Sequence, residues 1–122
     1  MNNQNVVVLG ASQKPERYSN KAVYELVKHG HQVYPVHPLF TEIHGQKCYK
    51  HLDDISCNID TLTLYVNKAQ STKLLDNIFA QKPNRIIMNP GTENDLLETK
   101  AKAYGIEVIR ACTLVMLSTK QF

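Results

Sequence analysis

The strongest candidate for a binding site in the sequence is a glycine-containing turn directly after an apolar run. Residues 6–9 read Val-Val-Val-Leu, and Gly10, Ala11 and Ser12 follow them. A strand that ends in a small-residue turn before a helix presents free backbone N–H groups, which bind phosphate. Lys14 and Arg17 would add positive charge in the same loop. The pattern predicts an anion site here, although a tight strand-to-helix turn without a ligand fits the same residues.

The residues beyond this turn argue against a standard dinucleotide site. No glycine lies between Gly10 and Gly30, so the G-x-G-x-x-G pattern is absent. The second apolar run ends in Val36, His37 and Pro38, where NAD-binding folds usually place an acid against the ribose hydroxyls. Because no acid is present, a ribose with a 3′-phosphate would not be repelled. A solvent-facing loop histidine is the alternative interpretation of His37.

Polar residues also follow the third and fourth apolar runs. Asn67 and Lys68 come after the third, and Asn89, Pro90 and Gly91 come after the fourth. Ligands of open parallel sheets bind beyond the carboxyl ends of the strands, so these residues would line one cleft. The simpler interpretations are a helix N-cap at Asn67 and an ordinary turn at 89–91.

The remaining histidines and cysteines indicate neither a metal site nor a catalytic residue. None of the histidines lies at metal-ligand spacing from a cysteine or carboxylate. Cys112 follows the last apolar run and would reach the cleft, but a buried structural thiol is the simpler interpretation. No nucleophile–base pair can be assembled, so we predict no catalytic residue and no metal.

Length, composition and charge narrow the class of protein. The chain has 122 residues, is 43% hydrophobic and 20% charged, and carries a net charge of +3. We expect one domain over residues 1–122. The basic residues are scattered, so we expect no nucleic-acid partner. No apolar stretch approaches membrane length, the first residues do not resemble a signal peptide, and three unpaired cysteines suit a reducing compartment, so the expected location is cytoplasmic.

The elements that must position these loops alternate along the chain. Short apolar runs predict strands at residues 6–9, 33–36, 62–66, 85–88 and 107–109. Amphipathic segments predict helices at 20–29, 69–81 and 94–104, with a short helical turn at 112–117. Ser19 is expected to cap the first helix and Gly30 to end it. Such alternation implies an α/β domain of three layers, α/β/α, around a parallel sheet.

Two segments depart from this regular pattern. In the third predicted strand Thr61, Thr63 and Tyr65 alternate with apolar residues, so that face is either less covered or turned toward a ligand. The irregular stretch 38–60 is expected to hold a small edge strand at 46–49 and one helical turn at 52–55.

Motifs along essentially the whole chain resemble the small CoA-binding proteins of Rossmann-like fold and the N-terminal domain of the succinyl-CoA synthetase α subunit. The most specific is V-x-P-V-x-P at residues 33–38, preceded by Gly30 and His31. Many relatives have Asn where this chain has His37. The other matching residues are Gly10-Ala11-Ser12, Pro15, Arg17-Tyr18-Ser19, Ile43, Gly45, the run 60–66, Asn89-Pro90-Gly91, Gly105-Ile106 and Ala111-Cys112.

The resemblance implies a sheet of order 3-2-1-4-5-6, with the short third strand at 46–49. It also implies a bound coenzyme A or acyl-CoA, its pyrophosphate at the turn 10–12, its adenine near 36–38 and its pantetheine past Asn67 and 89–92. The residues expected to contact this ligand are Gly10, Ala11, Ser12, Lys14, Pro15, Arg17, Tyr18, Ser19, Val36, His37, Pro38, Asn67, Lys68, Asn89, Pro90 and Gly91.

We therefore expect a stand-alone, non-catalytic module that binds CoA or acyl-CoA. Succinyl-CoA synthetase needs a second domain with a phosphorylated histidine and a partner subunit, and these 122 residues carry neither. Two alternatives stay open. One is an enzyme that acts on a CoA thioester or nucleotide through Cys112 or His37. The other is a protein-interaction scaffold with a vestigial nucleotide fold, for example a homodimer.

Overall fold

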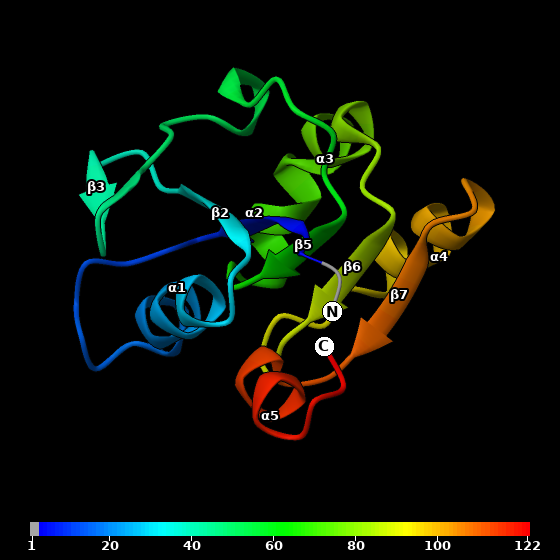
Figure 1. Cartoon of the computed structure of the whole chain (residues 1–122). Helices are drawn as coiled ribbons and strands as arrows, with labels where there is room; N and C mark the ends of the chain where they lie inside the picture. The colour runs from blue at the N-terminus through cyan, green and yellow to red at the C-terminus, as the bar shows by residue number, and fades with distance from the viewer. Residues whose placement is uncertain (1–2) are drawn as a thin grey trace.

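A five-stranded parallel sheet forms the centre of the molecule (Figure 1). The computed structural model describes residues 3–122. The strands are β1 (Asn5–Leu9), β2 (Gln32–Val36), β5 (Thr61–Leu64), β6 (Arg85–Met88) and β7 (Glu107–Arg110). They lie in the order β2-β1-β5-β6-β7, and every neighbouring pair is parallel. The predicted parallel α/β architecture is confirmed.

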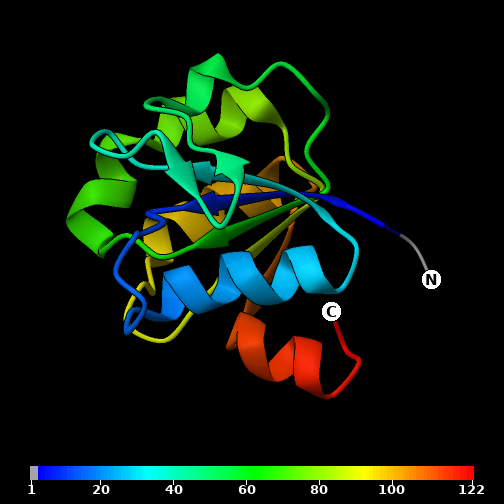
Figure 2. The same cartoon turned by 60° about the vertical axis from the view of Figure 1, so that its left-hand side comes forward.

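Helices cover both faces of this sheet (Figure 2). One face carries α1 (Tyr18–Lys28) and α5 (Thr113–Ser118), and the other carries α2 (Lys68–Lys73), α3 (Leu75–Gln81) and α4 (Asp95–Ala103). Side chains of a strand alternate between the faces, so Val6 and Val8 pack with Val23 of α1, whereas Val7 packs in the opposite cluster with Ile78 of α3. This double burial explains the continuous apolar run in β1. Within residues 3–122, no helix combines the length and the apolar character needed to cross a bilayer.

The expected third strand is reduced to one residue in the main sheet. Two short strands, β3 (Glu42–Ile43) and β4 (Gln46–Lys47), instead pair with each other as an antiparallel hairpin. Only Tyr49 bridges Val36 of β2, because its N–H donates to the Pro35 carbonyl at 2.9 Å and its carbonyl accepts from the His37 N–H at 3.0 Å. The predicted helical turn is confirmed as the 3₁₀ helix η1 (Leu52–Asp54).

Helix boundaries differ from the prediction at two places. Helix α1 begins at Tyr18, two residues earlier than a Ser19 cap predicts, and Ser19 is buried within its first turn. The predicted helix over 69–81 is two helices, because Leu74 leaves helical geometry with ψ of 9° and its N–H donates to the Ser71 carbonyl, three residues back. Gly30, at φ +88°, follows the C-cap of α1, as expected.

The threonine side chains of β5 are buried and form hydrogen bonds with other side chains of the protein. Thr61 is buried, and its hydroxyl donates to Gln4 Oε1 at 2.6 Å. Thr63 is fully buried and pairs with the Thr113 hydroxyl at 2.7 Å. The expectation of a less covered or ligand-facing side was therefore wrong for the two threonines, whereas Tyr65 of the same alternating pattern lines cavities described below.

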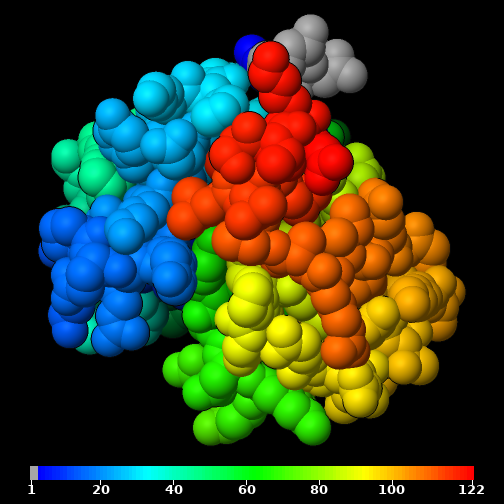
Figure 3. All heavy atoms as spheres, turned by 90° about the horizontal axis from the view of Figure 1, so that it is seen from below, coloured from blue at the N-terminus to red at the C-terminus, as the bar shows by residue number. Residues whose placement is uncertain are grey.

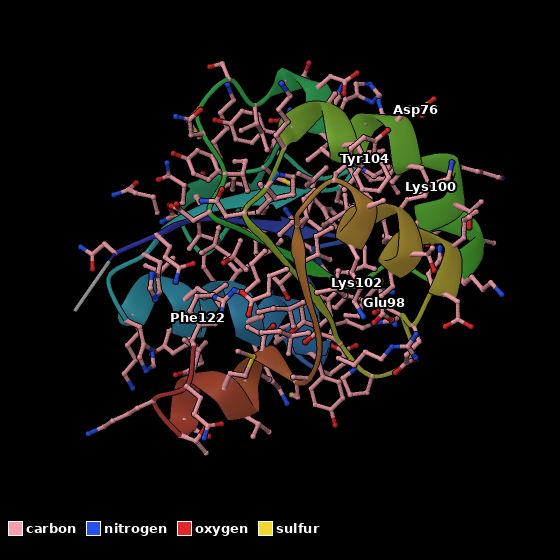
Figure 4. The ribbon with its side chains drawn as sticks, turned by 90° about the vertical axis from the view of Figure 1, so that its right-hand side faces the viewer. Asp76, Glu98, Lys100, Lys102, Tyr104 and Phe122 are labelled. Atoms are coloured by element: carbon pink, nitrogen blue, oxygen red, sulfur yellow. The ribbon has the colours of Figure 1, made fainter. Side chains whose placement is uncertain are left out.

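Both ends of the described chain meet at His31, on the amino edge of the sheet. The N–H of Gln4 donates to His31 Nδ1 at 3.1 Å, and the Phe122 ring lies 5.1 Å from the His31 ring. The Arg85 guanidinium stacks over the same Phe122 ring at 4.6 Å. Figure 4 shows Phe122 at this end of the molecule, far from the turns that follow the strands.

Candidate functional site

Two neighbouring cavities open along the carboxyl edge of the sheet. The turn cavity, of about 750 Å³, lies among the loops that follow β1, β5 and β6. The β2 cavity, of about 580 Å³, lies between the end of β2, the η1 region and α2–α3. Gly10, His37, Tyr65 and Val66 line both. Figure 3 shows the segments of the turn cavity, blue, green and yellow, converging on one face.

Most of the residues predicted to bind a ligand lie at these two cavities. Those at the turn cavity are Gly10, Ala11, Ser12, Lys14, Arg17, Tyr18, Ser19, His37, Asn67, Pro90 and Gly91. Those at the β2 cavity are Gly10, Val36, His37 and Pro38. Pro15, Lys68 and Asn89 line neither cavity. Loops distant in sequence thus come together because parallel strands end at one edge of the sheet.

The backbone of the first turn leaves two N–H groups free for an anion. The N–H groups of Gly10 and Ala11 both donate to the Val36 carbonyl, at 3.0 and 3.2 Å, so they anchor the turn to β2. Among residues 3–122, the N–H groups of Ser12 and Gln13 find no acceptor. Within the turn predicted to bind an anion, the free donors are therefore those of Ser12 and Gln13, and Asn20 of α1 contacts this part of the turn by donating to the Ser12 carbonyl.

Gly10 allows this turn to pass close to β5. Its φ is +93°, and a Cβ placed there would lie 2.8 Å from Val66 Cγ1 and 3.0 Å from the Tyr65 carbonyl carbon. Both the backbone angle and the contact require glycine. The glycine thus sets the path of the chain, while the residues after it carry the free donors.

The side chains around both cavities favour a negatively charged ligand. Lys14 and Arg17 line the turn cavity, and no carboxylate among the described residues joins them. Lys50 and Lys73 line the β2 cavity. The β2 cavity also contains one acidic residue, Asp53. Its carboxylate oxygens accept hydrogen bonds from the Asn77 side chain at 3.0 and 3.1 Å, which satisfy part of their hydrogen-bonding capacity. The charged residues that line the two cavities are therefore mostly basic, although the Glu93 carboxylate accepts from the N–H of Gly91, which lines the turn cavity, at 3.0 and 3.3 Å.

His37 is a half-buried wall between the cavities. Its ring stacks on Phe40 with 4.3 Å between centroids, and its Nδ1 accepts from the Leu39 N–H at 3.1 Å. Burial lowers the pKa of His37, so the ring is neutral at neutral pH. The uncharged His37 ring is therefore part of the cavity lining, and the interpretation of His37 as a solvent-facing loop residue does not describe it.

Asn89 serves the site from within the core. It is buried, and its Nδ2 donates to the Thr63 hydroxyl at 2.7 Å and to the Leu64 carbonyl at 2.9 Å. Its Oδ1 accepts from the Thr113 N–H at 2.8 Å. Asn89 therefore ties β5, β6 and α5 together, and holds the turn of Pro90 and Gly91 against the cavity.

Tyr65 is a site residue that the sequence analysis did not select. It lines both cavities, and its hydroxyl is buried near Thr63 and Thr113 without a hydrogen bond of acceptable geometry to either. Burial raises the pKa of Tyr65 to about 12, and the hydroxyls of Thr113 and Thr63 oppose the rise. The phenol is therefore a neutral group. Its alternation with Thr61 and Thr63 was the available sequence signal.

The unfolding free energy of the wild-type protein is expected to fall more steeply at alkaline pH than that of the Tyr65→Phe variant. The folded state holds the Tyr65 proton to about pH 12, whereas the ordinary value of 10.0 applies once the chain unfolds. The contribution is complete below pH 10 and falls as pH rises toward 12, by about 1.4 kcal/mol per pH unit. Denaturant unfolding at pH 9, 10 and 11 measures it. Identical losses in both proteins would contradict the assignment, because all other tyrosines are shared.

Cys112 lines neither cavity. It occupies the N-cap position of α5, half-buried, and is a free thiol like Cys48 and Cys57. Within the described part of the chain, no group of three or more His, Cys, Asp or Glu side chains is placed to hold a metal ion. The geometry favours the structural interpretation of Cys112.

Comparison with protein families gives one match over nearly the whole chain. A family described as "CoA binding domain" matches residues 4–118. Among curated proteins, the ADP-forming acetate–CoA ligase of Methanocaldococcus jannaschii is 27% identical over 124 residues, covering 95% of this chain. The chain spans only 18% of the length of that ligase.

Solved structures with the same fold include small proteins and parts of large ones. An uncharacterized protein superimposes over the full length of both chains with a TM-score of 0.94 and 37% identity. A hypothetical protein of Pyrococcus horikoshii gives 0.89 and 27%, covering 96% of this chain and 83% of its own. A dinucleotide-forming acetyl-CoA synthetase of Ca. Korarchaeum cryptofilum, at 0.75 and 23%, shares the fold over 88% of this chain and 25% of its own.

Proposed function

Because this chain belongs to the CoA binding domain family, we propose that it binds coenzyme A along the two cavities of the carboxyl edge. The family match confirms the resemblance drawn from the motifs. The observation that carries the proposal is the unbonded N–H of Ser12, which lines the turn cavity with Lys14 and Arg17, together with the unbonded N–H of the adjacent Gln13. Two free backbone amides, with basic side chains and no carboxylate among the described residues that line the turn cavity, suit the pyrophosphate of CoA.

The two cavities suit the two halves of the CoA molecule on either side of its pyrophosphate. Val36, Pro38 and Leu52 give the β2 cavity apolar walls for an adenine ring, and Lys50 and Lys73 offer charge for the 3′-phosphate. The turn cavity would receive the pantetheine between Asn67 and the 90–92 turn. These contacts concern the nucleotide and the arm, so free CoA and acetyl-CoA are expected to bind with comparable affinity.

Binding without catalysis is the second part of the proposal. The His37 Nδ1 is already occupied and the phenol of Tyr65 is neutral, so neither is poised as a base at neutral pH. Cys112 lines neither cavity. The ligation performed by acetate–CoA ligase is a property of a much longer protein, of which this chain spans 18%. We propose for this chain only the CoA-binding part.

Calorimetric titration and thermal shift with CoA, acetyl-CoA and NAD test the proposal. At a CoA concentration of 100 times Kd, the protein is expected to gain about 2.7 kcal/mol of stability. NAD shares the adenine and the pyrophosphate but lacks the 3′-phosphate and the pantetheine, so it is expected to give no shift at equal concentration. A protein that binds NAD and not CoA would overturn the proposal, and one that binds neither would favour the scaffold alternative.

A further inference from the structure

The β3–β4 hairpin reaches across to the phosphate turn through two side chains. Gln13 Nε2 donates to the Glu42 carbonyl at 2.9 Å, from the turn to the hairpin. His44, at the hairpin tip, is 2.8 Å from Asn20 Oδ1 through its Nε2. Ile43 of the same hairpin is buried in the core cluster that contains Ala11 and Val23, and the two polar contacts add links to Gln13 and Asn20.

Asn20 relays the hairpin contact to the backbone of the turn. It is a buried residue of α1, and its Nδ2 donates to the Ser12 carbonyl at 2.8 Å. Since the amide nitrogen faces Ser12, the amide oxygen faces His44 and accepts a hydrogen bond from the His44 Nε2–H. The His44 tautomer with its hydrogen on Nε2 provides that donor.

The relay acts on the peptide unit that also contains one of the free donors. The Ser12 carbonyl and the Gln13 N–H belong to the same planar trans peptide, and they point in opposite directions. A hydrogen bond that holds the carbonyl toward Asn20 therefore turns the Gln13 N–H away from Asn20. The orientation of this donor depends on one amide and, through it, on His44.

We infer that Asn20 and His44 are positioning residues that hold the Ser12–Gln13 peptide plane ready for the ligand pyrophosphate. The inference rests on the proposed CoA binding for its ligand, and on the chain of hydrogen bonds for its mechanism. The Tyr24 ring packs edge-on against the His44 ring at 5.4 Å between centroids and keeps the imidazole beside Asn20. The hairpin is thus part of the binding apparatus, although its tip lies outside the turn and β2 cavities.

The test variant is His44→Asn, because His44 has a positive φ of 49°, which Asn tolerates well. Asn is too short to reach Asn20, so the hydrogen bond is lost without new backbone strain. We expect the Gln13 amide resonance of the ligand-free protein to shift and broaden, and CoA affinity to fall about tenfold, the effect of one hydrogen bond. The control is His29→Asn, since His29 caps the far end of α1 and lines neither cavity.

A conservative rescue separates positioning from general stability. In His44→Gln the side-chain amide nitrogen lies about as far from Cβ as Nε2 of histidine, so both the Gln13 resonance and CoA affinity should stay near wild type. An unchanged Gln13 resonance in His44→Asn, or equal losses in the Gln and Asn variants, overturns the inference. The amide measurement needs no ligand, so it decides the positioning role even if CoA fails to bind and the proposed function falls.

Discussion

Replacing Ser12 with Glu is expected to lower the affinity for CoA by about three orders of magnitude. The new carboxylate would lie beside the two unbonded N–H groups, where the pyrophosphate is proposed to bind. Two unit charges 4 Å apart repel by about 4 kcal/mol at an effective dielectric constant of 20, which corresponds to about a thousandfold. Titration calorimetry measures the loss, and the CoA-dependent thermal shift should vanish at concentrations that saturate the wild type.

Two further variants show whether the effect is local. Ser56→Glu adds the same charge on an exposed loop that lines neither cavity, so its affinity for CoA should match the wild type. Ser12→Ala keeps the backbone N–H and removes only the hydroxyl, which accepts from the Lys14 N–H at 3.1 Å, so a small loss is expected. Near-normal CoA binding by Ser12→Glu would show that the CoA pyrophosphate does not bind at this turn.

Gly10→Ala is expected to cost about 3–4 kcal/mol of unfolding free energy, combining backbone strain with overpacking. The added methyl would meet Val66 Cγ1 at 2.8 Å, and the φ of +93° is strained for alanine. Neither neighbour can withdraw easily, because the backbone of Tyr65 lies 3.0 Å from the same point and is bound to β1. Chemical denaturation without ligand measures the loss.

Gly91→Ala is the matched control for this substitution. Gly91 has nearly the same φ, +92°, but no atom lies within 4 Å of its added Cβ. Its loss should be about 1–2 kcal/mol, the cost of the backbone angle alone. If the two variants lose equal stability, the close passage of the turn over β5 contributes nothing, and only the angle requires glycine at position 10.

The fold was predictable because its signals are local and repeated. The strands of the five-stranded sheet were predicted from short, mainly apolar runs followed by turn residues, and Asn67 caps α2 as the simpler interpretation held, within a capping box that includes Gln70. Arg17 occupies the N-cap position of α1 without a capping hydrogen bond from its side chain, so the cap predicted at Ser19 was wrong by two residues. The break at Leu74 depends on a change of backbone angle that apolar periodicity does not record.

The site was predictable to the level of loops and less so to the level of atoms. The small-residue turn was found, but the carbonyl of Val36 that occupies the Gly10 and Ala11 N–H groups comes from another strand. In the sequence Asn89 looks like an ordinary turn residue. In the structure it is buried, and its side chain forms hydrogen bonds to Thr63, Leu64 and Thr113. Contacts such as His44 with Asn20 join separate elements, and nothing in either local sequence indicates the other.

The meeting of both chain ends at His31 makes this fold suited to use as a module. Gln4 and Phe122 contact the same imidazole on the amino edge of the sheet, while both cavities open on the carboxyl edge. A polypeptide fused at either end would emerge behind the sheet and leave the cavities uncovered. Domain fusion, tethering to a surface or joining of the two ends by a short linker is therefore compatible with an accessible binding edge.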